Sequence, residues 1–347
     1  MIRSLTVMLA AVLSVLLIAT AVPWAQSAAG PQFPPPGPKT HIVFGQPTAP
    51  PNVVHSPIEL AKALGYTDKF NIDLDIKDFE ASTRALTAAI TGAVNVGTLD
   101  CISAFGNGVP LVGFYGPAPK LPVVLVGRDS IKTLKDLKGK KLGLSSPPGG
   151  FIDRMNRAVL DAAGLKPEDV TTVQTTTAGR VPSLLTGQSD TAVFHYEQAS
   201  RVLRLQKGFH VMYDLQKALP EYQYHVYCAP RQWVQQHREA VVNLVAATIL
   251  AVRYAYANRA ETVRILSTVT GAAPEDVGYA YAKIVTTCVW ARNLGLNPTR
   301  LAWSINYEHQ GGNLRNPYDI SKLLDMSIAN EALARAGGPV PVPAGCE

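Results

Sequence analysis

The sequence predicts an α/β protein made of two lobes of similar design. Short apolar or alternating stretches, typical of strands, take turns with stretches whose apolar residues recur at helical spacing. The order strand–helix–strand–helix–strand occurs twice, and the second helix of each series ends in Thr-Gly, at Gly92 and at Gly187. Such alternation favours parallel sheets, whose ligands bind beyond the carboxyl ends of the strands. Two lobes of this kind leave a crevice between them for a ligand.

The first series of elements follows a Pro-rich stretch. The expected strands cover residues 41–45, 72–76, 94–99, 110–115 and 121–127, and the expected helices cover 54–64, 83–91 and 101–106. The Ile-Asp-Leu-Asp-Ile run at 72–76 predicts a strand with one buried face. Ser82 is a candidate cap for helix 83–91. Asp100 precedes the next helix, and we favour a capping role for it over the binding of a cationic ligand group.

The second series is organised around residues 138–164. A short strand at 141–145 is followed by a helix at 151–163, with Gly164 at its C-cap. The loop Ser145-Ser-Pro-Pro-Gly-Gly150 would expose backbone N–H groups and two hydroxyls at the positive end of that helix, which is a generic anion-binding arrangement. A serine cap and a Pro-Gly turn are also common structural features. The Gly-Lys-Ser/Thr ending of a nucleotide-binding loop is missing.

The rest of the chain adds two more strands to the second lobe and a helical layer. Strands are expected at 170–174 and 191–194, a helix at 180–186, a strand at 222–228, and helices at 238–258, 260–268, 274–291 and 320–336. We expect Trp290, Trp303 and Tyr307 to pack within this helical layer, and residues 338–347 to form a flexible Pro-rich tail.

The N-terminus has the pattern of an export signal. Arg3 precedes an apolar run, Leu5 to Ala21, and Ala25-Gln-Ser27 offers small residues for cleavage. We therefore expect residues 1–27 to be a signal peptide and 28–38 a Pro-rich linker, with retention of the leader as a membrane anchor as the alternative. The net charge of +6 is dispersed along the chain, which favours an acidic ligand or simple solubility over nucleic-acid binding.

The cysteines and nucleophiles indicate neither a metal site nor a catalytic one. Four cysteines lie far apart with no Cys-x-x-Cys pair, so neither a metal nor another cofactor is expected. In an exported protein some of them can pair. We favour Cys288 with Cys346, which would tie down the tail, although buried free thiols remain an alternative. Ser145 has no assigned histidine partner and no Gly-x-Ser-x-Gly elbow exists, so no catalytic residue is assigned.

Several stretches resemble one family of proteins. The matching stretches are 42–48, 58–65, 88–92, 134–146 (Leu-Lys-Asp-Leu-Lys-Gly-Lys-Lys-Leu-Gly-Leu-Ser-Ser), 184–193 and 290–295. With these, the chain resembles the substrate-binding proteins of ABC importers in the nitrate/sulfonate/taurine group, which share a domain with thiamine-pyrimidine synthases. The resemblance implies a type II periplasmic-binding-protein fold with two Rossmann-like lobes. Its lobes would comprise residues 39–121 with 229–337, and residues 122–228.

The resemblance also implies a function. The protein would be a periplasmic, monomeric binding protein that captures a small organic anion, a sulfonate or carboxylate with a possible aromatic part, and delivers it to the transmembrane permease subunits of an importer. The alternative is a thiamine-pyrimidine-synthase-like enzyme or a binder of a pyrimidine precursor, but the dispersed cysteines count against the enzyme. The strand ends and helix starts supply the candidate ligand-binding residues, which are Gln46, Thr48, Asn52, Ser82, Thr98, Ser145, Ser146, Gly149, Gly150, Phe151, Arg180, Phe194, His195 and Tyr196.

The leader gives the first testable prediction. Intact-mass analysis of the protein recovered from the periplasm should show cleavage near Ser27, because the apolar run is shorter than the ~20 residues that span a bilayer. Recovery of the full-length chain in the membrane fraction would show instead that the leader is retained.

Overall fold

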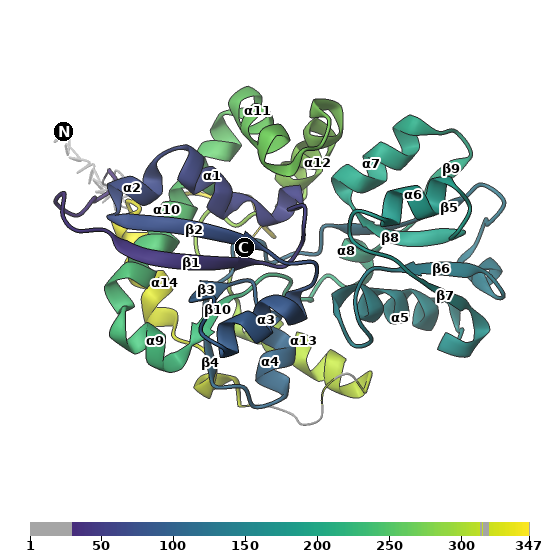
Figure 1. The fold of residues 1–347 in the computed structure, drawn as a ribbon, viewed down its shortest axis with the longest axis horizontal. Coiled ribbons are helices and arrows are strands. Elements are labelled where there is room, and N and C mark those ends of the chain that lie inside the picture. Colours follow the sequence, from purple (N-terminus) through teal and green to yellow (C-terminus); the bar gives the residue numbers. More distant parts are fainter. Residues whose placement is uncertain (1–29, 313, 315–318, 347) are drawn as a thin grey trace, which may run out of the picture.

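The computed structural model describes residues 30–312, 314 and 319–346, so the expected signal peptide lies outside the described residues. Two five-stranded sheets lie at the centres of two lobes, as Figure 1 shows. The strands of the first sheet are β1(Thr40–Gln46), β2(Ile72–Asp78), β3(Val96–Gly97), β4(Leu111–Tyr115) and β10(Tyr227–Pro230). Those of the second are β5(Val123–Arg128), β6(Lys141–Leu144), β7(Thr171–Gln174), β8(Thr191–His195) and β9(Phe209–Asp214). The expected two-lobed α/β architecture is confirmed.

The two sheets have matching topology. Their strand orders are β2-β1-β3-β10-β4 and β7-β6-β8-β5-β9. In each sheet the first three strands pair in parallel, and the fourth, β10 or β5, is antiparallel to both of its neighbours. That antiparallel strand is the one the chain enters after crossing from the other lobe. The sheets are therefore mixed rather than purely parallel, because each crossing brings the chain in from the opposite end of the sheet.

Helices cover both sheets. Those of the first lobe are η1(Val53–His55), α1(Pro57–Ala63), α2(Tyr66–Lys69), α3(Ser82–Ile90), α4(Cys101–Gly106), α9(Arg231–Gln236), α10(Arg238–Ala257), α11(Arg259–Thr270), α12(Pro274–Thr286), α13(Pro298–Gln310), η4(Ile320–Lys322) and α14(Met326–Arg335). Those of the second lobe are η2(Leu134–Leu137), α5(Phe151–Ala163), η3(Pro167–Asp169), α6(Arg180–Leu185), α7(Tyr196–Leu205) and α8(Leu215–Ala218). In Figure 1, α7 lies beside α12 where the lobes meet.

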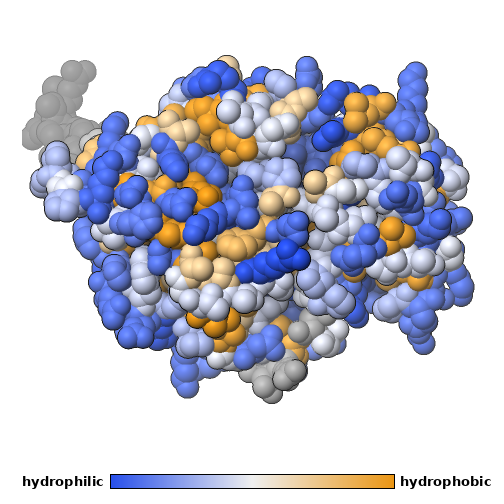
Figure 2. All heavy atoms as spheres, viewed as in Figure 1, coloured by the Kyte–Doolittle hydropathy of each residue, from blue (hydrophilic) through white to orange (hydrophobic). Residues whose placement is uncertain are grey.

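Helix α10 is the central helix of the first lobe. Of the helices in the described part of the chain, it alone is long and apolar enough to cross a membrane by length and composition, and 78% of its apolar window is buried inside the protein. It packs against α1 and α14. Helices of this length and apolar composition also occur in protein cores, and the burial of α10 is that of a core helix. Figure 2 shows a mostly hydrophilic surface with small, separate hydrophobic groups in this view.

Several expected elements differ from the structure, and the helix expected at 320–336 is divided into η4 and α14. The strand expected at 222–228 is confined to Tyr227–Pro230, because the preceding residues pack on α13 instead, where the Gln223 N–H donates to Ser304 Oγ (2.7 Å). The helix expected at 274–291 ends at Thr286, since Cys288 adopts a left-handed backbone conformation (φ 53°). The strand expected at 94–99 shrinks to Val96–Gly97.

Several other elements were not expected at all. The longer ones are α7, α13 and β9, and the shorter ones are α2, α8, α9, η2 and η3. The sequence did contain a start signal for helix α13, namely Asn297 followed by Pro298. In the structure the Asn297 side chain caps the helix by accepting hydrogen bonds from the Thr299 and Arg300 N–H groups. Trp303 lies on this helix.

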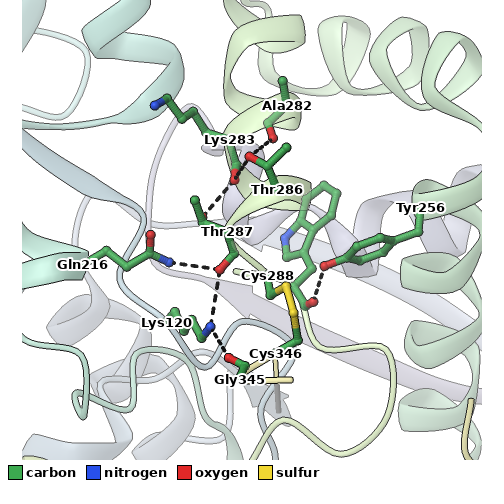
Figure 3. Close-up of a disulfide and its surroundings, with 11 residues drawn as sticks. Lys120, Gln216, Tyr256, Ala282, Lys283, Thr286, Thr287, Cys288, Gly345 and Cys346 are labelled. Atoms are coloured by element: carbon green, nitrogen blue, oxygen red, sulfur yellow. Dashed lines mark hydrogen bonds between the residues drawn. A yellow bond between two sulfur atoms is a disulfide. The ribbon is translucent and has the colours of Figure 1, made fainter. Parts of the chain in front are cut away.

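Two disulfides join parts of the chain that are distant in sequence. The expected Cys288–Cys346 bond is present and ties the tail to the end of α12, while Cys101–Cys228, which was not assigned, links α4 to β10. Figure 3 shows the first bond and the Lys120 ammonium beside it, which donates to the carbonyl oxygens of Gly345 (2.6 Å) and Thr287 (3.4 Å). The C-terminal tail is therefore held against the segment that carries the chain into the second lobe.

A close approach of two loops gives the second prediction. A Cβ at Gly295 (φ 63°) would lie 2.0 Å from the Gly116 carbonyl oxygen, whereas a Cβ at Gly271 (φ 65°) would meet nothing within 4 Å. Gly295→Ala should therefore lower the free energy of unfolding by about 1–3 kcal/mol more than Gly271→Ala, the overpacking cost beyond the shared backbone strain. Denaturant unfolding of both variants measures this difference, and equal losses would show that the loops can separate.

Candidate functional site

A cavity between the lobes brings the strand ends together. Its empty space is about 750 Å³, counting the open mouth. The carboxyl ends of β1, β3, β6 and β8 all face it, which is the expected place for a ligand in α/β sheets. The segment 222–226 between the lobes closes one wall. A position at the strand ends between two lobes is typical of a small-molecule site.

The turn before α5 forms part of the second-lobe wall. The backbone N–H of Asp153 donates to Ser146 Oγ (3.1 Å), and the Gly149 N–H donates to Asp153 Oδ2 (2.8 Å), so these groups fix the turn from within. A Cβ at Gly150 would lie 2.8 Å from the Ser146 Cβ, so the tight turn requires a glycine there. Ser145 is 7% exposed, and its hydroxyl has no hydrogen-bond partner among the described residues. That hydroxyl is therefore free for a ligand.

Arg180 brings a buried positive charge to the cavity. It is 1% exposed, its guanidinium donates to the Val193 carbonyl oxygen (2.9 Å), and it lies near the Phe194 ring. Burial lowers the pKa of Arg180 to about 10, while Glu197 acts in the opposite direction, so the guanidinium stays charged at neutral pH. Glu197 accepts a hydrogen bond from the Asn52 amide (2.5 Å), and burial raises its pKa.

Three histidines and a tyrosine form a second wall. The Tyr224 hydroxyl lies 3.1 Å from His55 Nε2 and 2.9 Å from His195 Nε2, and His55 Nδ1 lies 3.1 Å from Thr48 Oγ1. His225 stacks against both His55 and Tyr224, at centroid distances of 4.5 and 4.2 Å. Phe151 reaches this cluster from the second lobe, 4.9 Å from the Tyr224 ring.

Burial keeps these imidazoles neutral. Burial, with a further contribution from the charge of Arg180, lowers the pKa of His55 from 6.5 to about 3. Burial likewise lowers the pKa values of His195 and His225 well below the usual range. Each ring therefore carries one N–H donor and one acceptor nitrogen at neutral pH. Neither ring nitrogen of His225 has a hydrogen-bond partner within the described structure, although the residue is only 2% exposed.

Asp100 lies between β3 and α4 and has a different role from the one expected. Its backbone is left-handed (φ 53°), and its side chain does not cap α4 because capping requires an extended backbone at that position. Its Oδ1 instead accepts a hydrogen bond from Arg154 Nη2 (3.0 Å). Its Oδ2 is buried without a partner in the described part of the protein. Ser82, the other expected cap, lies inside α3 and makes no capping bond.

The structure brings most of the candidate residues together. Those that line the cavity are Thr48, Ser82, Thr98, Ser145, Ser146, Gly150, Phe151, Arg180 and His195. Those that lie outside its wall are Gln46, Asn52, Gly149, Phe194 and Tyr196. Gln46 donates to the His55 carbonyl oxygen and is fully buried, whereas Phe194 is in the core. These outer residues support the wall from behind.

Several wall residues were not among the candidate ligand-binding residues. The polar ones are His55, Glu80, Thr83, Asp100, Arg154, Thr177, Tyr222, Tyr224 and His225. The Tyr-Gln-Tyr-His run at 222–225 has the aromatic and polar side chains of a binding site, but it was interpreted as a strand and not as part of the cavity. In the described residues no group of three or more His, Cys, Asp or Glu side chains could hold a metal ion. Among the described cavity residues, the Thr48 hydroxyl lies 3.1 Å from His55 Nδ1, whereas no serine hydroxyl has a hydrogen-bonded imidazole partner.

Comparison with protein families and curated proteins gives two matches. Residues 52–262 match the family described as NMT1/THI5 like. A putative thiamine biosynthesis protein of Haemophilus influenzae is 30% identical over 181 residues, which cover 49% of this chain. The match spans 56% of that relative's own length.

Solved structures share the fold. The alkanesulfonate-binding protein SsuA of Xanthomonas axonopodis pv. citri has a TM-score of 0.66 at 18% identity, covering 83% of this chain and 99% of that one. The periplasmic nitrate-binding protein NrtA of Synechocystis PCC 6803 scores 0.69 at 14% identity, covering 85% and 89%. The desulfurization enzyme DSZB scores 0.61 at 16% identity, covering 86% and 99%. These likenesses establish the periplasmic-binding-protein fold.

The neutral histidines give the third prediction. The folded His55 binds fewer protons than the unfolded one between pH 3 and 6.5, so acid should destabilise the protein across this window. Each proton taken up on unfolding changes the free energy of unfolding by about 1.4 kcal/mol per pH unit. His55→Asn should therefore flatten the dependence of stability on pH by up to that slope.

Thr48→Val is the matched control for this prediction. It removes the hydrogen-bond partner of His55 Nδ1 but keeps the titrating ring, so its slope should match that of the wild type. Urea unfolding between pH 4 and 7 measures all three proteins. An unchanged slope in His55→Asn would show that this imidazole does not carry the effect.

Proposed function

Since the chain belongs to the NMT1/THI5-like family, we propose that it is the solute-binding component of an ABC importer. It captures a small organic anion in the cavity between the lobes and delivers it to the transmembrane permease subunits. It acts in the periplasm as a monomer, after loss of the leader. The observation that carries the proposal is the cavity itself, which both lobes line and which holds buried polar groups without partners among the described residues.

An anionic group on the ligand fits the second-lobe wall. The charged guanidinium of Arg180 lines the cavity there, and α5 points its N-terminus at the same wall. The free Ser145 hydroxyl adds a donor at this end of the cavity. Together these groups favour a carboxylate or a sulfonate. The structurally similar SsuA of Xanthomonas binds alkanesulfonates, which is consistent with this class of ligand.

A flat part with hydrogen-bonding groups fits the remaining walls. Phe151 and Tyr224 offer ring faces, and the unpartnered nitrogens of His225 offer one donor and one acceptor. Asp100 Oδ2 is a further acceptor. A purely aliphatic acid would leave these buried groups unsatisfied, which costs free energy. The ligand is therefore an acid that also carries at least one hydrogen-bond donor.

A pyrimidine precursor is the second candidate ligand. The curated relative is named a putative thiamine biosynthesis protein, and a pyrimidine ring would rest against the aromatic wall formed by Phe151 and Tyr224, whose rings contact each other. Thermal-shift screening should separate the two candidates if it includes aromatic and aliphatic sulfonates, carboxylates and aminopyrimidines. Binding stabilises the folded protein by mass action, so the preferred class raises the melting temperature most. If no compound of these classes does so, the proposed ligand is wrong.

The two serines of the turn give the fourth prediction. Ser145→Ala should weaken binding of the best compound about tenfold, the loss expected for a charge-assisted hydrogen bond near the low end of 1.5–3 kcal/mol. It should leave the stability of the ligand-free protein nearly unchanged, because that hydroxyl has no partner in the described structure. Isothermal titration and denaturant unfolding measure the two effects.

Ser146→Ala is the matched comparison. It should also weaken binding, but it additionally removes the hydrogen bond from the Asp153 N–H, so it should cost about 1 kcal/mol of stability. If Ser145→Ala binds as tightly as wild type, the turn is only a helix cap, and the ligand is held elsewhere.

A further inference from the structure

One buried arginine joins the two lobes beside the cavity. Arg154 lies on α5 of the second lobe, and its guanidinium pairs with two carboxylates of the first lobe. Nη2 lies 3.0 Å from Asp100 Oδ1, and Nε lies 3.1 Å from Glu308 Oε1 on α13. The three side chains are at most 4% exposed. Water screens this cluster little, so it acts at close to its full strength.

The same guanidinium holds the turn that lines the cavity. Arg154 Nη1 donates to the carbonyl oxygen of Gly149 (2.7 Å) and to the Ser103 hydroxyl on α4 (2.9 Å). Burial opposes the charge on Arg154, but Asp100, Tyr222 and Glu308 raise its pKa well above the usual value. One permanently charged side chain therefore touches the candidate ligand turn and two helices of the opposite lobe.

A second ion cluster joins the lobes at α7 and α12. Arg204 on α7 donates to Asp276 on α12 at 3.1 and 2.6 Å, and Ser200 donates to the same carboxylate (2.8 Å). The Arg204 side chain is 41% exposed, however, so solvent weakens this pair. Of the two clusters, the one at Arg154 is the better shielded from solvent.

We propose that Arg154 is a latch that keeps the lobes closed in the absence of ligand and positions the turn at 145–150. Opening the cavity would carry α5 away from α4 and α13. Asp100 and Glu308 would then lose the guanidinium that they share. Because Glu308 is 0% exposed, its carboxylate would be left buried without that cation, which costs free energy. The closed arrangement is thus favoured by contacts within the protein itself. The inference goes beyond the proposed function and does not depend on the class of ligand.

The latch has a kinetic consequence for ligand exchange. A ligand enters only when the cluster opens, so the fraction of open molecules limits the rate of association. Loss of the latch raises that fraction. The turn at 145–150 also loses the bond between Arg154 and the Gly149 carbonyl oxygen, so it is less well ordered for binding.

Small-angle X-ray scattering of the ligand-free full-length mature protein tests the latch. Wild type should match the profile calculated for the closed structure. Arg154→Met should give a larger radius of gyration and a larger maximum dimension. Arg157→Met is the control, since Arg157 lies on the same helix and pairs only with Asp153 within that helix among the described residues (3.1 Å). It should scatter as wild type does.

Arg154→Lys serves if the methionine variant does not fold. A lysine keeps the charge but has no planar fork to hold both carboxylates, so it should open the protein partly. The proposal is overturned if the ligand-free wild type is already open, if the folded Arg154 variant scatters as wild type does, or if Arg157→Met opens the protein as much. The experiment uses no ligand, so failure of the proposed function would leave its result intact.

Discussion

Buried charges at the contact between the lobes must find their partners across that contact. Glu197 in the second lobe meets Asn52 in the first, Asp276 meets Arg204, and Arg154 meets Asp100 and Glu308. An unpaired charge in such a position costs several kcal/mol, which is a large share of the stability of a typical domain. The relative placement of the lobes therefore follows from these pairs. The shape of the cavity follows in turn, because its walls come from both lobes.

Each lobe holds the chain firmly where it enters from the other lobe. Each sheet receives its antiparallel strand, β10 or β5, directly after a crossing, and that strand is hydrogen-bonded to a strand on each side. The disulfide Cys101–Cys228 further fixes β10 to α4 within the first lobe. Each crossing segment therefore leads into a strand that its own lobe holds on both sides. The second disulfide and Lys120 hold the C-terminal tail against one of those segments.

The cavity presents buried hydrogen-bonding groups and aromatic ring faces to a ligand. Its imidazoles are neutral and either share the Tyr224 hydroxyl or lie stacked, as His225 does, and none faces a serine nucleophile. The fold by itself does not decide between binding and catalysis, because the desulfurization enzyme DSZB has the same fold. The distinction lies in the side chains at the strand ends. Fold alone would leave binding and catalysis equally open.

Local patterns in the sequence determined many of the elements and most of the cavity turn. Helix α5 spans the expected residues 151–163, because its apolar spacing and the Gly164 cap are local signals. The Ser145–Gly150 turn lines the cavity because it ends a parallel strand.

Only the tertiary structure decided which distant residues meet. The partners of Arg154 lie 54 and 154 positions away along the chain, at 100 and 308, and no local pattern specifies such a pair. Asp100 is a residue type that commonly caps helices. Because its backbone is left-handed and Arg154 lies beside it, its carboxylate accepts a hydrogen bond from Arg154 instead. Tyr224 and His225 have the alternation of a strand, yet they close a wall, because the segment packs on α13. Periodicity reports which residues are buried along one element, whereas pairing across a cleft depends on how whole lobes are placed.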